Sequence, residues 1–175
     1  MKNFSKLFGG IVLCSNILAH PVCTNFWGGT ACGSGKVDSL ESQGVVNITG
    51  TEVVGKTNVQ GSFNVKKATL NIVEVHGSTA ISDSRVLGKS TLLGSLEATN
   101  TSFENNIDIH SDNMSFNSCK IGLLSVTSKN RPGKVMLTGN TRANKIIFNQ
   151  AGGEVWLYDD AKVMTDVVGG KIVKK

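Results

Sequence analysis

Between Gly44 and Ser128, short apolar runs alternate with polar residues in a pattern that recurs every 16 to 18 residues. Four of the five units open with glycine. A fixed period of this kind is the sequence signature of a repeat architecture. The five units are GVVNITGTEVVGKTNVQ, GSFNVKKATLNIVEVH, GSTAISDSRVLGKSTLL, GSLEATNTSFENNIDIHS and DNMSFNSCKIGLLSVTS.

Three positions of the unit are apolar in every repeat except one, where Thr79 stands. Residues two apart on a strand point to the same side, so the third and fifth positions face one interior. The tenth position lies past a bend, on a second strand that faces the same interior. The three columns are Val46, Phe63, Thr79, Leu96 and Met114; Ile48, Val65, Ile81, Ala98 and Phe116; and Val53, Leu70, Val86, Phe103 and Ile121.

Apolar runs this short cannot bury a face alone, but stacked coils can, because each strand pairs with its equivalent in the next coil. The pattern therefore predicts an all-β fold, a parallel β-solenoid of the right-handed β-helix type. We expect Gly and Asn at corners that need a positive φ. A β-sandwich of short strands is the alternative.

The repeat is interrupted at Lys129–Gly133, where Pro132 predicts an extended loop. It then resumes in two longer units that begin at Gly133 and Gly153. The solenoid domain should thus run over residues 44–175, with about seven coils of roughly 17–20 residues.

The first 19 residues have the pattern of a signal peptide cleaved near Ala19: two lysines, then the apolar stretch Leu7–Ala19. The stretch is too short for a membrane anchor, and neither Cys14 nor Cys23 follows the small residue that lipidation requires. We expect an exported protein, periplasmic or secreted, that is not an integral membrane protein. An N-terminal buried helix is the alternative.

Residues 20–43 differ from the repeats in composition and lack their pattern. We expect them to cap the solenoid, with Phe26 and Trp27 covering the open end of the first coil. Cys23 and Cys32 lie nine residues apart, which in an exported chain favours a disulfide. A zinc site that also used His20 would have too few convincing ligands.

The formal charge of +5 falls to +3 without Lys2 and Lys6, and it is unevenly distributed. Residues 129–175 hold nine basic and four acidic residues, whereas residues 44–128 hold six and seven. We expect no nucleic-acid partner. The partner stays open, with a cell-surface glycan or protein as candidates.

No arrangement of residues predicts catalysis, a cofactor or a metal. His20, His76 and His110 are scattered, and no histidine lies near Cys119 in the repeat to activate it. Gly-Lys-Thr at 55–57 and Gly-Lys-Ser at 88–90 lack the upstream glycine and the following helix of a phosphate-binding loop. Asp159 and Asp160 are adjacent and are expected at an exposed corner.

The repeats resemble those of short-repeat bacterial β-solenoids. Glycine, small residues and Val or Ile recur with a spacing similar to that of the bactofilins, a family whose β-helices stack end to end into filaments. The export signal and the Cys-containing segment depart from that family. The likeness is greater to uncharacterised exported β-solenoid proteins of Gram-negative bacteria, which implies no particular function.

The sequence thus favours a non-enzymatic structural or binding protein whose outer faces, rich in Asn, Thr, Ser and Lys, meet a glycan or a protein. One alternative is a glycan-cleaving β-helix enzyme with an acidic site. The other is a bactofilin-like polymer. We expect a monomer, because Lys171–Lys175 places three lysines on the last strand, as natural sheet edges do.

Overall fold

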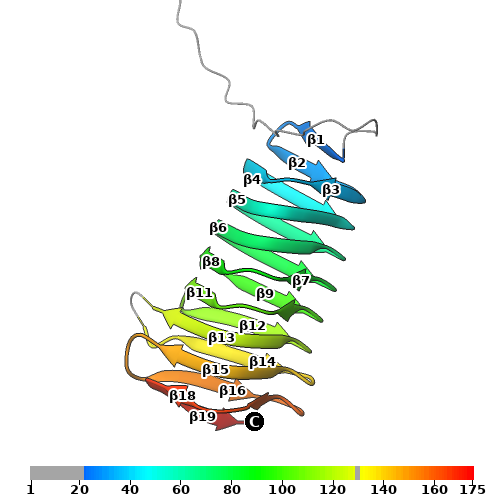
Figure 1. Ribbon diagram of the computed structural model, residues 1–175. Coiled ribbons are helices and arrows are strands. Elements are labelled where there is room, and N and C mark those ends of the chain that lie inside the picture. The colour runs from blue at the N-terminus through cyan, green and yellow to red at the C-terminus, as the bar shows by residue number, and fades with distance from the viewer. Residues whose placement is uncertain (1–21, 129–130) are drawn as a thin grey trace, which may run out of the picture.

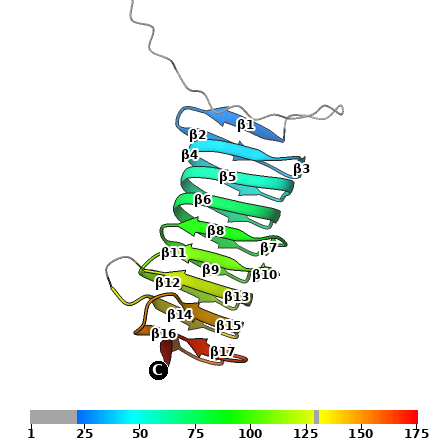
Figure 2. The same cartoon turned by 60° about the vertical axis from the view of Figure 1, so that its left-hand side comes forward.

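A computed structural model describes residues 22–128 and 131–175, and these form one elongated stack of parallel strands (Figures 1 and 2). The stack is a parallel β-solenoid of about eight turns, so the predicted architecture is confirmed and the β-sandwich alternative is wrong. The signal-peptide region 1–19 and His20 lie outside the described residues, as do residues 129 and 130 of the expected loop.

Each turn contributes a strand segment to each of three parallel ladders, which we call faces A, B and C. Face A contains β2 (Gly29–Cys32), β9 (Leu96–Thr99), β12 (Asn113–Asn117), β14 (Lys134–Thr138), β16 (Gly153–Leu157), β19 (Gly170–Lys174) and the C-terminal parts of the long strands β4 (Leu40–Thr49), β5 (Thr51–Lys66) and β6 (Thr69–Ser82).

The other two faces complete each turn. Face B contains β3 (Gly35–Val37), β7 (Arg85–Val86), β10 (Ser102–Phe103), β17 (Lys162–Val163) and the first parts of β5, β6, β13 (Lys120–Thr127) and β15 (Arg142–Phe148). Face C contains β8 (Ser90–Leu93), β11 (Ile107–His110), β18 (Val167–Val168) and the remaining parts of β4, β5, β6, β13 and β15.

The strand register confirms the predicted apolar columns. In face A, Val46 pairs with Phe63, then Thr79 and Leu96, and the ladder continues into the two longer C-terminal turns. The side chains of this ladder are buried, so the interior is a set of stacked like residues. The buried residues of this ladder are Thr30, Val46, Phe63, Thr79, Leu96, Met114, Val135 and Val155.

The sequence analysis expected two strands per coil and missed the ladders of face C. There Leu40 pairs with Thr57, and the ladder continues through Val73 and Ser90 to Ile107 and beyond. The corner between faces B and C varies in length by one residue: Val53 lies four residues before Thr57, whereas Leu70 lies three before Val73, so the register shifts between Val53 and Lys56. These positions therefore do not align when residues are counted from the start of each unit.

The corner between faces A and B has one left-handed residue in each of seven turns, and the expected Gly or Asn occupies it in three of them. Gly50 has φ 72° and Asn100 has φ 47°. A short or solvated side chain tolerates this conformation with little strain. The other residues at this corner are Lys67, Asp83, Ser118, Gly139 and Asp159.

The N-terminal hairpin differs in part from the expected cap. β1 (Cys23–Phe26) pairs antiparallel with β2, and the Cys23–Cys32 disulfide closes the hairpin as predicted. Regular parallel pairing already begins at Gly29. Phe26 is 47% exposed and Trp27 is 99% exposed, so the expectation that these rings cover the open end is wrong.

The hairpin explains that exposure. Because β1 continues the ladder as a further strand, it places Trp27 in the turn between β1 and β2, at the side of the stack. Cys23 and Cys32 are only 7% and 5% exposed, and their side chains face the interior instead.

Candidate functional site

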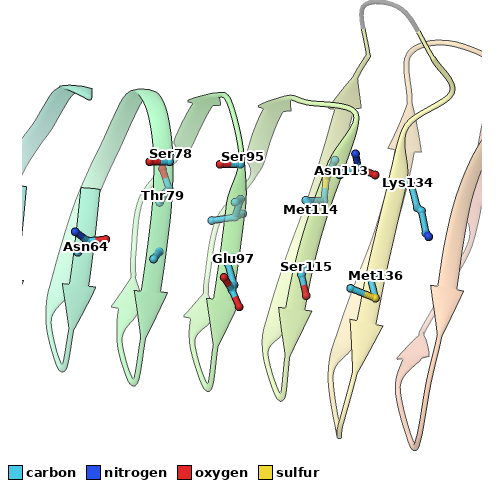
Figure 3. A pocket seen from close by; sticks show the side chains of 12 residues that line it. Asn64, Ser78, Thr79, Ser95, Glu97, Asn113, Met114, Ser115, Lys134 and Met136 are labelled. Carbon is cyan, nitrogen blue, oxygen red and sulfur yellow. The ribbon is translucent and has the colours of Figure 1, made fainter. Parts of the chain in front are cut away.

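Face A carries a hollow of about 500 Å³ on its outer surface, across five consecutive turns (Figure 3). It crosses the ends of β5 and β6 and then β9, β12 and β14. The side chains that line it are mainly hydroxyl, amide and thioether groups. The lining residues are Asn64, Ser78, Thr79, Ala80, Ser95, Leu96, Glu97, Asn113, Met114, Ser115, Lys134 and Met136, of which Thr79, Leu96 and Met114 have buried side chains.

The hollow follows from the alternation of side chains along each strand. Ala80, for example, lies between the inward residues Thr79 and Ile81 and therefore points outward. Its neighbours in adjacent strands are Asn64 and Glu97. Because Ala80 and the nearby serines are short, solvent approaches the sheet closely here, between the longer outward residues Asn64, Glu97 and Met136.

Hydrogen bonds between neighbouring turns order the N-terminal end of the hollow. The Asn64 amide donates to Asn47 Oδ1 at 3.0 Å, and the hydroxyls of Ser62 and Ser78 are 3.1 Å apart. A second hollow of about 290 Å³ shares Asn64, Ala80 and Glu97 with the first. The two form one surface on which donors and acceptors recur once per turn.

The larger hollow combines hydrogen-bonding groups with apolar surface. Glu97 is the one carboxylate among the residues that line the larger hollow. Glycoside hydrolysis usually needs two carboxyl groups on either side of the scissile bond. The described lining therefore offers recognition of hydroxyl and amide groups without the usual pair of glycosidase carboxylates.

An aromatic group continues the same outward row past the hollow. Trp156 on β16 pairs in register with Met136 on β14, and Lys134 belongs to the hollow as well. The Lys134 ammonium lies 3.4 Å from the centroid of the Trp156 ring, and that of Lys175 lies 4.2 Å from it. Tyr158 lies beside this ring, with 6.5 Å between ring centroids.

Glu154 is the carboxylate of this aromatic end. Trp156 Nε1 donates to it at 2.9 Å, and Lys171 pairs with it at 2.9 Å. These two hydrogen bonds, in that order, hold the pKa of Glu154 below its ordinary value. Glu154 is thus ionised and engaged by Trp156 and Lys171.

Among the described residues, the two histidines, the phosphate-loop-like segments and the paired aspartates do not form a site. His76 and His110 lie exposed at the ends of face C strands. Thr57 and Ser90 are buried in the interior, so they cannot line a phosphate cradle. The predicted exposure of Asp159 is confirmed; its Oδ2 accepts a hydrogen bond from the Gly139 amide at 2.9 Å.

Of the described cysteines, Cys119 is the one outside the disulfide. Cys119 is a free, buried thiol in the small-residue corner beside Thr101 and Thr141, and burial raises its pKa. In residues 22–128 and 131–175, no three His, Cys, Asp or Glu side chains gather closely enough to hold a metal ion. The same residues contain no apolar helix of the length needed to cross a membrane.

Comparison with protein-family models, curated proteins and solved structures finds no match for this chain. The fold and the surface of face A therefore define its class, a β-solenoid. The likeness to bactofilin repeats stays a prediction from the sequence.

The sequence analysis missed the hollow and gave Trp156 no role. The fourth position of each unit contained the signal, because it lies between the two buried columns and must point outward. From Asn47 this row continues through Asn64, Ala80, Glu97, Ser115, Met136 and Trp156. A short residue flanked by longer ones in that row indicates a hollow.

Proposed function

We propose that this protein is an exported, non-enzymatic binding module that holds an extended glycan along face A. The observation that carries the proposal is the hollow of about 500 Å³ that crosses five turns and combines hydroxyl and amide groups with apolar surface such as that of Ala80 and Met136. A parallel solenoid repeats these groups about every 4.8 Å along its axis. A glycan chain likewise presents hydroxyl groups at regular intervals, so a ladder of donors and acceptors suits it.

The charges of face A support a glycan over a folded protein. Several ion pairs link neighbouring turns on the other two faces, such as Lys36 with Glu52, Lys56 with Glu74 and Lys89 with Asp108. The larger hollow has only Glu97 and Lys134 as charged residues. A surface with few charges and many neutral polar groups recognises hydroxyl groups without a large desolvation cost.

Export is supported by two features. The first 19 residues have the composition of a signal peptide. The Cys23–Cys32 disulfide is typical of an oxidising compartment. Mass spectrometry of the protein recovered from its own cells tests this part of the proposal: we expect a mature chain that starts near His20, and a retained Met1–Ala19 segment in the folded protein would contradict it.

Binding is tested on the purified mature chain with a panel of neutral and acidic polysaccharides, by co-sedimentation and then calorimetry. We expect at least one extended polysaccharide to bind. Ala80→Trp should abolish that binding, because it fills the hollow. Thr91→Trp is the matched control, since Thr91 points outward from β8 on face C. Equal binding by both variants, or no binding to any glycan of the panel, would refute a glycan site on face A.

The glycan-cleaving alternative is tested with the same panel. Release of reducing ends or of unsaturated sugars should stay at the level of a protein-free control. If product forms and Glu97→Gln abolishes it, the protein is an enzyme and the proposal is wrong.

A further inference from the structure

The aromatic end of face A has an unusual electrostatic arrangement. Two ammonium groups, those of Lys134 and Lys175, lie within 3.4 Å and 4.2 Å of the centroid of one indole ring. In the part of the chain that the structure describes, neither ammonium forms an ion pair with a carboxylate. Two like charges that share one ring repel each other, and the ring's negative face offsets that repulsion only in part.

The nearby carboxylate, Glu154, is the cross-strand neighbour of Lys134 and offsets only part of this positive charge. Glu154 is paired with Lys171 and accepts the Trp156 Nε1–H bond. With Lys134, Lys171 and Lys175 against Glu154, this end of face A has an excess of positive charge.

The same end is continuous with the hollow. Lys134 lines the hollow and also lies over Trp156, and Met136 pairs with Trp156 across adjacent strands. From Asn64 to Trp156 the outward row spans six strands, roughly 24 Å at about 4.8 Å per strand. A single extended ligand can therefore occupy the hollow and reach the indole.

We propose that the glycan bound by face A is acidic, and that the end formed by Trp156, Lys134 and Lys175 is the subsite for one of its carboxylate-bearing sugars. The sugar carboxylate pairs with the two ammonium groups and removes their mutual repulsion. The lysines then leave the face of the indole free to stack on the apolar face of the sugar ring. This inference rests on the proposed function and adds the class of glycan.

A nucleic acid is the other anionic polymer to consider, and the surface suits it less. Single-stranded nucleic acids bind to grooves in which several aromatic residues stack successive bases along a basic track. The described part of face A has one neighbouring aromatic pair, Trp156 and Tyr158. The lining residues of the hollow include one lysine, Lys134.

The test compares matched polymers that differ only in charge. Oligomers of galacturonate, mannuronate and glucuronate are titrated into the mature chain, each as the free acid and as the methyl ester. The probes are calorimetry and indole fluorescence in a Trp27→Phe background, since the chain has two tryptophans and this leaves Trp156 as the reporter. We expect at least one free acid to bind and to quench Trp156, its ester to bind at least about tenfold more weakly, and higher salt to weaken binding of the acid.

Lysine substitutions show which residues cause the preference for the free acid over the ester. Lys134→Gln and Lys175→Gln should each weaken binding of the acid by about five- to tenfold and leave the ester unaffected. Lys120→Gln is the matched control, because Lys120 is exposed on face B, away from both hollows, and should change neither.

The results that would contradict the acidic subsite can be told apart from those that would contradict glycan binding. If acid and ester bind equally, or if a neutral glycan binds and none of the three uronates does, the acidic subsite is wrong and the glycan-binding function stands. If no glycan binds, both are wrong. If oligo-dT binds more tightly than every uronate and Lys134→Gln weakens it, the anionic ligand is a nucleic acid and the inference is overturned.

Discussion

The side-chain amide of Asn64 donates a hydrogen bond to Oδ1 of Asn47, its partner one turn earlier, across 3.0 Å. Both residues stand on the outer surface, while their chain neighbours Phe63 and Val65 are 0% and 3% exposed. One strand thus contributes alternately to a solvated ladder of amides and to the core.

The register of this alternation gives the first prediction. Val65→Asp and Leu70→Asp should each unfold the chain or destabilise it by about 3 kcal/mol or more, because an unpaired charge would enter a stacked apolar ladder. Asn64→Asp changes an exposed side chain and should have a small effect. Denaturant unfolding of the three variants provides the measurement; equal losses for Val65→Asp and Asn64→Asp would contradict the register.

A second prediction concerns hydroxyl groups in the core. Thr79 lies in the ladder between Phe63 and Leu96, and its buried Oγ1 has no hydrogen-bond partner. Thr79→Val should therefore stabilise the protein by about 1 kcal/mol, since it removes an unsatisfied polar group and keeps the shape.

Thr141→Val is the control for that substitution. Thr141 is equally buried, but its hydroxyl donates to the Thr138 carbonyl at 2.7 Å and accepts from the Cys119 amide at 3.1 Å. Its loss should destabilise the protein by about 1–3 kcal/mol, because the Cys119 N–H remains buried without a partner. If both variants raise the unfolding midpoint, then the hydrogen bonds of a buried hydroxyl do not decide its effect on stability, and the prediction is wrong.

A third prediction concerns the disulfide. Non-reducing peptide mapping should show Cys23 joined to Cys32 and Cys119 free. Replacing both paired cysteines by serine should lower the free energy of unfolding by about 2–4 kcal/mol. Hydrogen exchange should place the loosening in β1 and β2, because turns of a solenoid contact only their neighbours; equal loosening in β14 and β16 would argue against this.

A fourth prediction concerns assembly. The strand β19 leaves Ile172 46% exposed at the C-terminal end of the described stack, beside the exposed lysines Lys174 and Lys175. Two such ends should repel each other, so light scattering on the mature chain should give a monomer at low salt, with any association appearing only as salt screens the charge. Micrometre-long filaments at low salt would instead favour the bactofilin-like polymer.

The sequence by itself determined the parallel solenoid and the interior ladders of faces A and B. Stacking forces equivalent residues of successive turns into contact, so a column such as Val46, Phe63 and Thr79 is visible as a constant spacing along the chain. The disulfide was predictable for a similar reason, since Cys23 and Cys32 are close in the sequence and a short hairpin joins them.

Only the tertiary structure decided the rest. The corner between faces B and C hid the ladders of face C, because its length differs by one residue between neighbouring turns, as the register shift between Val53 and Lys56 shows. The β1–β2 hairpin turned Trp27 outward by extending the ladder with an antiparallel strand. The hollow and the end around Trp156 depend on how far side chains of successive turns reach over one another, which spacing does not encode. The contacts of Lys134 and Lys175 with one indole require three turns to be stacked in register before they exist.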